Sequence, residues 1–240
     1  MCTHQLSSHP ISRRSALQFG TLTGAAMLVG AVSAPDLHAS TSPFHDDIAP
    51  APRDPQEALA QLYRGNARFV KGEITAPNRN MARLREVAGG QKPFAAFLGC
   101  ADSRVPIEIV FDQGFGDLFV TRIAGNVADP AIIGSLEFGT QVLGAQVLYV
   151  LGHSKCGAVS ATMTGGDVPG QISTLYQHIR RAAKEANGNL DVAITRNVQI
   201  QAEILSEASP VIAKRIKEGS LVLAGGVYDL DTGLVQAVPL

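Results

Sequence analysis

The chain is poor in the residues that mark several functional classes. Tryptophan is absent from its 240 residues, cysteine occurs three times, and aromatic residues make up 5%. The formal net charge is −1, so neither a basic nucleic-acid surface nor an acidic tail is indicated. No Cys-x-x-Cys pair or glycine fingerprint is present, which argues against a thioredoxin-type redox site and against dinucleotide or phosphate-loop binding. The hydrophobic share, 45%, is ample for one core.

Residues 1–34 read as a targeting segment rather than as part of the fold. Ser12–Leu17 carries an Arg-Arg pair typical of twin-arginine signals, and the apolar stretch after it is too short and small-sided for a good membrane span. Val32-Ser33-Ala34 fits a small-residue cleavage site, with Leu37–Ala39 as a second option. We therefore predict a signal peptide and an exported protein, periplasmic or extracellular, carried by the twin-arginine machinery. The alternative is an uncleaved anchor or an incidental arginine pair, because Ala16 stands where a large apolar residue is usual.

The segment 35–54 is rich in proline, serine and aspartate and reads as a linker. Residues 55–240 remain, which is long enough for one domain. Cys2 is lost with the signal, so Cys100 and Cys156 are left. In an exported protein such a pair suggests a disulfide. The alternative is a metal ion that protects both thiolates, bound in the cytoplasm before the folded protein is exported.

Short apolar runs alternate with amphipathic segments along the rest of the chain. The predicted strands are Pro93–Leu98, Leu118–Ile123, Ala145–Leu151 and Leu221–Ala224, followed by a terminal hairpin over Val227–Val235. The predicted helices are Pro55–Lys71, Ala82–Ala88, Pro130–Leu143, Ile172–Ala186 and Val192–Ser206. This alternation predicts an α/β fold with a central, mostly parallel sheet flanked by helices. In such folds, sites gather at the carboxyl ends of the strands.

Two segments that follow predicted strands carry residues suited to a metal. Cys100, His153 and Cys156 offer two thiols and one imidazole, which leave tetrahedral zinc one open position, as catalytic sites do. A helix starting at Ser154 would let His153 and Cys156 face one point. Asp102 is a possible fourth ligand, an acceptor beside the metal, or a cap for a helix after Ser103.

Several simpler interpretations stay open for the same residues. Each cysteine alone is most often a buried, inert thiol. A cysteine hydrolase needs one thiol beside a histidine base, and the second thiol is then unexplained. Arg104 either pairs with Asp102 or is a solvated surface residue. His178 lies on a polar helix, where solvent exposure is the usual outcome.

Four motifs in order give the chain a resemblance to a known family. They are Cys100-Ala101-Asp102-Ser103-Arg104, Gly116–Arg122 with Gly125-Asn126, Gly152-His153-Ser154-Lys155-Cys156-Gly157, and Tyr228-Asp229 with Thr232-Gly233. The chain resembles the β-class carbonic anhydrases, and the likeness covers roughly Asp54 to Val235. It implies one zinc ion per subunit, held by Cys100, His153 and Cys156.

The resemblance also implies a reaction and its residues. Asp102 and Arg104 form a dyad in which Asp102 accepts a hydrogen bond from zinc-bound water or hydroxide. That hydroxide attacks CO2 to give bicarbonate and a proton, reversibly. Gln91 matches a glutamine that contacts substrate in some members, and Phe119 and Ala124 fall where the family lines its small apolar CO2 pocket.

Assembly and regulation are further expectations. The resemblance implies a homodimer or a tetramer of dimers, with the helix Pro55–Lys71 as an arm on the partner and no nucleic-acid partner. Some members bind bicarbonate at a regulatory site that includes tryptophan and close with Asp on zinc; this chain has no tryptophan. We therefore predict the open state, with water rather than Asp102 as the fourth ligand. The alternatives are a CS2 or COS hydrolase on the same fold, and a zinc- or bicarbonate-binding protein without turnover.

Overall fold

A computed structural model describes residues 51–240 of the chain. The predicted signal peptide and most of the predicted linker lie outside the described residues. Within residues 51–240, none of the helices has the length and apolar character needed to cross a membrane.

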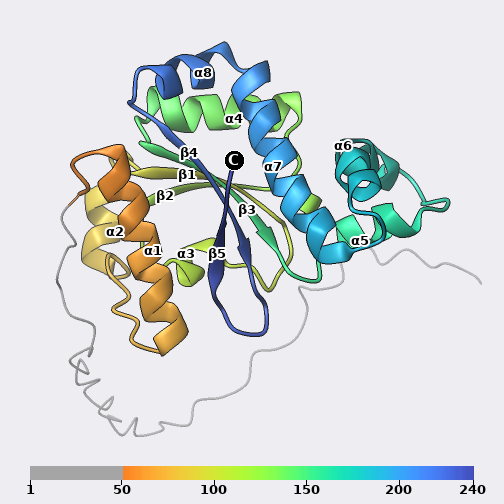
Figure 1. Cartoon of the computed structure of the whole chain (residues 1–240). Helices are drawn as coiled ribbons and strands as arrows, with labels where there is room; N and C mark the ends of the chain where they lie inside the picture. Colours follow the sequence, from red (N-terminus) through yellow and green to blue (C-terminus); the bar gives the residue numbers. More distant parts are fainter. Residues whose placement is uncertain (1–50) are drawn as a thin grey trace, which may run out of the picture. The chain divides into compact units, whose positions relative to one another are not determined.

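The described part of the chain is built around one five-stranded sheet. Its strands are β1 Ala95–Gly99, β2 Leu118–Arg122, β3 Val147–His153, β4 Val222–Tyr228 and β5 Val235–Val238. They lie in the order β2-β1-β3-β4-β5 (Figure 1). The first four run parallel and β5 runs antiparallel to β4, which confirms the predicted α/β class with a mostly parallel sheet.

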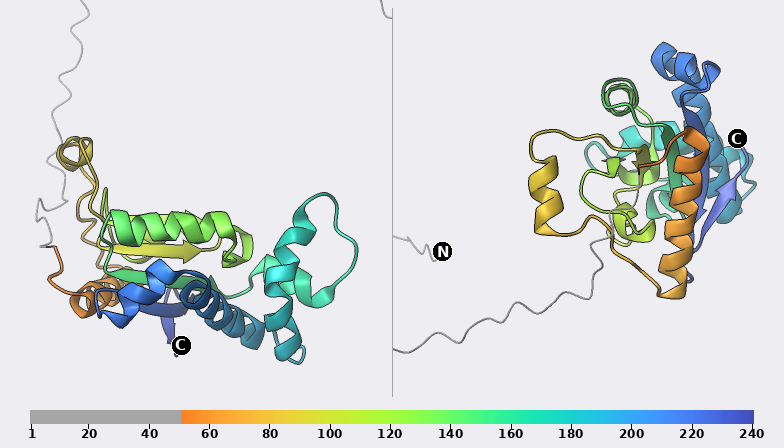
Figure 2. Two further views of the ribbon diagram at one scale, coloured as in Figure 1. Left: turned by 90° about the horizontal axis from the view of Figure 1, so that it is seen from above. Right: turned by 90° about the vertical axis from the view of Figure 1, so that its left-hand side faces the viewer.

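Helices cover both faces of this sheet (Figure 2). They are α1 Pro55–Lys71, α2 Met81–Val87, α3 Ile107–Val110, α4 Pro130–Glu137, α5 Gly157–Thr164, α6 Ile172–Glu185, α7 Leu190–Ala208 and α8 Pro210–Lys217. Phe97 and Tyr149 pack on the side of α1 and α3, whereas their neighbours Leu98 and Val150 pack on the side of α4, α7 and α8. Burial on both faces explains why the strands read as unbroken apolar runs.

The first helix has clear start and stop signals and is folded onto its own chain. Asp54 caps its first turn by accepting from the Glu57 amide, and Gly72, with φ 71°, ends it. Within the helix, the buried Asn66 side chain donates to the Gly233 carbonyl and accepts from the Val235 amide. Within its own chain, α1 packs through its buried face and through Asn66. Its expected contact with a partner subunit stays a prediction.

Several local expectations need correction. The helix predicted over Pro130–Leu143 ends at Glu137 and continues as a π-helical turn, Phe138–Val142. Strand β4 runs to Tyr228, beyond the predicted strand end at Ala224, and the predicted hairpin turn follows it before Val235. Helices α3 and α5 begin at Ile107 and Gly157, later than Ser103 and Ser154, and α8 was not foreseen.

Candidate metal centre

Cys100, His153 and Cys156 meet at the carboxyl ends of two neighbouring strands. Cys100 directly follows β1, His153 is the last residue of β3, and Cys156 caps α5. Since β1 and β3 are paired in parallel, their ends lie at the same edge of the sheet. One ligand atom from each of the three residues lies within 4.8 Å of the others, and all three side chains are buried. Both thiols are free, so no disulfide joins them.

A turn, not a helix, aims His153 and Cys156 at one point. Helix α5 begins only at Gly157, so the expected helix start at Ser154 is wrong. Lys155 adopts a left-handed conformation, with φ 56°, which reverses the chain between the two ligands. The Ser154 amide donates to the Tyr228 carbonyl at 2.9 Å and thereby continues the pairing of β3 with β4.

The His153 ring is oriented as a metal ligand. Its Nδ1 lies 2.9 Å from the Ser154 carbonyl oxygen, which can only accept, so Nδ1 carries the proton. Its Nε2 is then a lone pair that is buried without any hydrogen-bond partner. A carbonyl on the other ring nitrogen is the usual way in which proteins fix a metal-binding imidazole.

The two thiols are electrostatically coupled. The neighbouring Cys156 thiol, the nearby His153 ring and the Gly125 amide lower the pKa of Cys100 to about 4 against the opposing effect of burial. The same pairing raises the pKa of Cys156. The Gly125 amide lies 3.3 Å from the Cys100 sulfur. Gly125 has φ 76° and a Cβ there would lie 2.6 Å from Ile179, so only glycine brings this amide to the thiol.

These donors fit a zinc ion. Sulfur and imidazole nitrogen ligands in a Cys2His set are typical of zinc, and a buried lone pair without a partner is otherwise costly. Among residues 51–240 this is the one cluster of three or more such side chains close enough to share a metal.

Asp102 and Arg104 form a closed ion pair beside the cluster. Arg104 donates from its Nε to Asp102 Oδ1 at 2.9 Å and from its Nη2 to Oδ2 at 2.7 Å. The Arg104 hydrogen bonds hold the pKa of Asp102 well below its usual range. Asp102 Oδ2 lies 3.8 Å from His153 Nε2, so the carboxylate faces the place where the lone pair points. The next helix starts at Ile107, so Asp102 is not a helix cap, and Arg104 is not a simple solvated residue.

The three predicted pocket residues are not brought together within one chain. Ala124 directly precedes Gly125, next to the thiols, in a short 3-10 turn over Ala124–Asn126. Phe119 pairs with Ala96 in the sheet, and its ring packs 6.3 Å from that of Phe138.

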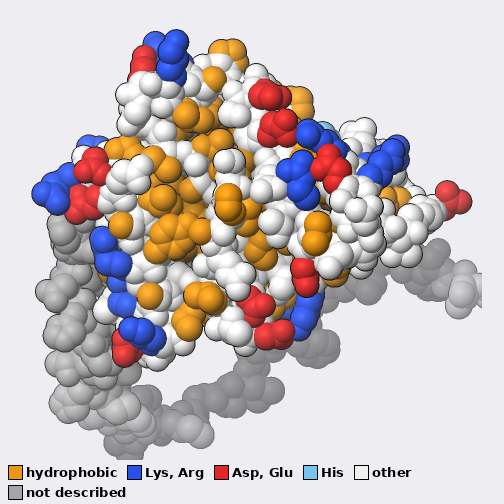
Figure 3. Space-filling view, viewed as in Figure 1, with side chains coloured by type: hydrophobic (Ala, Val, Ile, Leu, Met, Phe, Trp, Pro, Cys, Tyr) orange, Lys and Arg blue, Asp and Glu red, His pale blue; other side chains and the backbone are white. Residues whose placement is uncertain are grey.

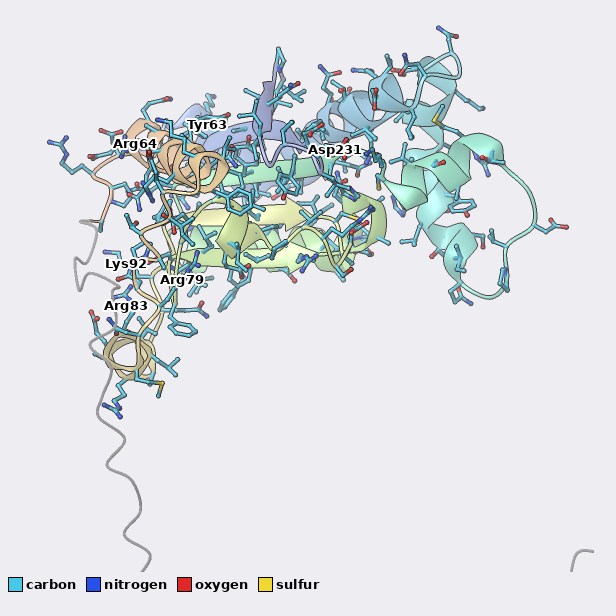
Figure 4. The ribbon with its side chains drawn as sticks, turned by 90° about the horizontal axis from the view of Figure 1, so that it is seen from below. Tyr63, Arg64, Arg79, Arg83, Lys92 and Asp231 are labelled. Carbon is cyan, nitrogen blue, oxygen red and sulfur yellow. The ribbon has the colours of Figure 1, made fainter. Side chains whose placement is uncertain are left out.

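Gln91 is exposed and precedes β1, at the strand end opposite Cys100. The five residues of β1 separate these two ends by about 16 Å. Figure 4 labels the next residue, Lys92, at one end of the sheet, and Asp231, in the β4–β5 turn, towards the other.

Two residues at the site carried no assigned role in the sequence analysis. One is Gly125, through its amide to Cys100. The other is Arg122, whose guanidinium donates to the carbonyls of Cys100 and Asp102. Both stand in a stretch quoted for the resemblance, but neither is a ligand type, and their contacts are to atoms that every residue has.

The fold and the site together define the class: an α/β protein whose parallel strands carry, at their carboxyl ends, a buried Cys2His cluster that could hold a metal ion. Residues 95–235, more than half of the chain, match the family model described as carbonic anhydrase. The chain therefore belongs to the carbonic anhydrase family, and it is a carbonic anhydrase of the β class.

Similar proteins from other organisms belong to the same family. The chain is 39% identical over 188 residues to carbonic anhydrase 2 of Mycobacterium tuberculosis, covering 75% of this chain and 91% of that protein. It is 36% identical over 191 residues to the carbonic anhydrase of Mycolicibacterium smegmatis, covering 76% and 93%.

Solved structures show the same fold. The β-carbonic anhydrase of Coccomyxa, in complex with acetazolamide, matches with a TM-score of 0.61 and 27% identity over 75% of this chain and 86% of that one. One of two tetrameric β-carbonic anhydrases from Sordaria macrospora matches with a TM-score of 0.62 and 24% identity, covering 65% and 86%.

Proposed function

We propose that the chain catalyses the reversible hydration of CO2 to bicarbonate and a proton at one zinc ion per subunit, held by Cys100, His153 and Cys156. The observation that carries this proposal is the buried, unpartnered Nε2 of His153 beside two thiols and the Asp102 carboxylate. Zinc bound there would supply a Lewis acid that makes water a nucleophile near neutral pH.

The residues of the chain would orient the attacking oxygen and exclude bulk water from the site. Asp102 is kept ionised by Arg104 and lies on the side that His153 Nε2 faces. There its carboxylate can accept a hydrogen bond from the attacking oxygen and so orient it. Burial of both thiols and of the ring keeps bulk water from the ligands. Ala124 and Phe119 remain candidates for the apolar CO2 pocket, and Gln91 for a substrate contact.

We also propose the open state, in which Asp102 stays off the metal and water is the fourth ligand. Both carboxylate oxygens of Asp102 are already held by Arg104, so ligation would require breaking a two-bond ion pair. Zinc X-ray absorption at pH 7 should give two sulfur, one nitrogen and one water oxygen at the metal. An Asp102 oxygen on zinc in a crystal grown at neutral pH would contradict the open state.

The first experiment is stopped-flow CO2 hydration by protein whose zinc has been quantified, with and without a chelator. Fast hydration that follows the zinc content would support the proposal. Stoichiometric zinc without hydration at any pH would refute it. The same preparation should then be given CS2 and COS, with sulfide release as the readout, and absence of all turnover would leave a binding role for zinc or bicarbonate.

We propose that the subunits associate as a homodimer or a tetramer of dimers. In support, apolar side chains gather between α1 and α7 (Figure 3). A groove of about 1090 Å³ lies in this part of the chain. Its apolar lining residues are Ala202, Ile216, Leu221, Val222, Leu223 and Leu240. The end strands β2 and β5 also leave backbone groups unpaired. Light scattering of the purified protein measures the state, and a monomer at micromolar concentration would contradict it.

We propose export through the twin-arginine route, with cleavage after Ala34 or Ala39. The support is the sequence of the first 39 residues alone. N-terminal sequencing of protein from the periplasmic fraction, with Arg13→Lys/Arg14→Lys as the matched variant, tests both the route and the cleavage site. Full-length protein retained in the cytoplasm by the native sequence would contradict export.

A further inference from the structure

Arg122 is an exposed residue at the end of β2 whose side chain reaches into the loop after β1. Its Nε donates to the Cys100 carbonyl at 2.8 Å and its Nη2 donates to the Asp102 carbonyl at 2.5 Å. One guanidinium thus bridges the backbone of a metal ligand and that of the carboxylate beside it.

The charge of Arg122 has no other use within residues 51–240. No carboxylate there lies within ion-pairing distance of it, whereas Arg104 is paired with Asp102. Hydrogen bonds from a charged donor are stronger than neutral ones, and the planar fork of arginine suits two acceptors at once. The geometry therefore indicates that Arg122 connects two backbone carbonyls and does not serve as a surface ion pair.

Besides Arg122, the loop is held by bonds from Arg104 to the Asp102 carboxylate, by the Gly125 amide on Cys100 and by two backbone bonds. Between Cys100 and the start of α3 it has no regular secondary structure. The Ala101 amide donates to the Ile123 carbonyl at 3.2 Å, and the Val105 amide closes a turn on the Asp102 carbonyl at 3.1 Å. Among residues 51–240, only Arg122 joins the Cys100 and Asp102 carbonyls to each other, and so it fixes the spacing between the Cys100 backbone and that of Asp102.

We propose that Arg122 is a positioning residue, which sets the Cys100 thiolate and the Asp102 carboxylate in one fixed arrangement around the metal. The role of Asp102 in this statement rests on the proposed CO2 hydration, whereas the role of Cys100 needs only a bound metal.

The test compares Arg122→Ala and Arg122→Lys with Arg180→Ala, an exposed arginine on α6 without an ion pair among the described residues. Two readouts do not depend on turnover: the affinity for Zn²⁺ against a chromophoric chelator, and the sulfur-to-cobalt charge-transfer bands of the Co²⁺ protein. CO2 hydration at saturating zinc is the third. Thermal unfolding checks that every variant is folded.

We expect Arg122→Ala to bind Zn²⁺ roughly 10- to 100-fold more weakly, as losses next to metal ligands typically do. Its cobalt bands should shift and its hydration rate should fall by about tenfold. Arg122→Lys should recover part of each effect, because one charged donor remains, and Arg180→Ala should change none.

Unchanged Zn²⁺ affinity and cobalt bands in Arg122→Ala would overturn the proposal, whether or not hydration falls. If Arg122→Ala does not fold, Arg122→Lys against Arg180→Lys carries the same comparison. If the unsubstituted protein hydrates no CO2, the proposed function fails, but the affinity and cobalt readouts still decide the role of Arg122.

Discussion

The two loops that carry the metal ligands are supported in different ways. The carbonyls of Cys100 and Asp102 in the loop Cys100–Arg104 are held by one exposed side chain, Arg122, from the strand at the edge of the sheet. The turn His153–Cys156 is held by backbone: the Ser154 amide donates to Tyr228, and the Leu230 amide donates to the Ser154 hydroxyl.

The support of the second loop extends to the N-terminal helix. Asp229 caps the β4–β5 turn by accepting from the amide and hydroxyl of Thr232, and Asn66 in α1 holds the returning strand through Gly233 and Val235. On the His153 side the Asn66–Val235 bond is buried and the Leu230–Ser154 bond is partly buried, whereas on the Cys100 side the bond from Arg122 to the Asp102 carbonyl is exposed. Segments with exposed bonds open at lower cost. We expect the loop with Asp102 to be the adjustable half of the site.

The largest effect should come from removing a ligand from either loop. Cys100→Ala, His153→Ala or Cys156→Ala should each lose zinc and all measurable hydration, because two remaining ligands do not hold the ion. Metal analysis after gel filtration measures the zinc content, with Ser160→Ala on α5 as the control. Retention of stoichiometric zinc by any of the three would contradict the assigned ligand set.

A change confined to the adjustable loop should separate turnover from metal binding. Asp102→Asn keeps the shape of the side chain but loses its charge, so zinc should stay bound while hydration falls by about 100-fold or more. Stopped-flow rates per zinc ion give the result. Undiminished hydration would overturn the role of Asp102.

The contribution of the Asp102–Arg104 ion pair to the stability of the fold should depend on pH. Arg104 lowers the pKa of Asp102 in the folded protein below the unfolded value of about 3.9. The pair therefore adds stability that is fully present above that pH and is lost as pH falls through the folded-state pKa. Arg104→Gln should be less stable near neutral pH, and its deficit should shrink below about pH 4. Urea unfolding from pH 7 to 3 measures this, and a deficit that does not vary with pH would argue against the pair.

The smallest effect on Zn²⁺ affinity should come from the exposed ion pair of Lys155, in the turn His153–Cys156. Lys155 bonds Asp231 across the hairpin at 2.7 Å, but both side chains are largely exposed, and such pairs contribute little. Asp231→Asn should change Zn²⁺ affinity by no more than about threefold, far less than Arg122→Ala. A larger loss than that of Arg122→Ala would reverse the comparison between the loops.

The sequence was sufficient for the sheet and for the clustering of Cys100, His153 and Cys156, because strands buried on both faces and thiols at their ends leave local patterns. It was insufficient for the turn between the ligands. A left-handed Lys155 leaves no local signal, so a helix from Ser154 was the natural expectation. Helix α8, by contrast, begins with a Ser209 cap and Pro210, a start signal that was present but not used.

At this site, distance along the chain is a poor guide to distance in space. Gln91 stands nine residues before Cys100 but lies at the other end of β1, and its substrate contact stays a prediction. Arg122 shows the converse. It lies 22 residues from Cys100 and bonds to its carbonyl, an atom that every residue has, so no spacing in the sequence points to the contact.

The bonds that lock the His153 turn also determine when it can form. Val235 donates to Asn66 from 169 residues further along the chain, and Leu230 donates to Ser154 from 76 residues further along. A growing chain that still lacks residues 228–238 thus contains all three ligands but not the bonds from Leu230 and Val235. Since a domain folds as a unit as it leaves the ribosome, stable metal capture should coincide with completion of the chain, not with the emergence of Cys156. We therefore expect the metal to be bound only after the strand β5 has been synthesised, and before the proposed export.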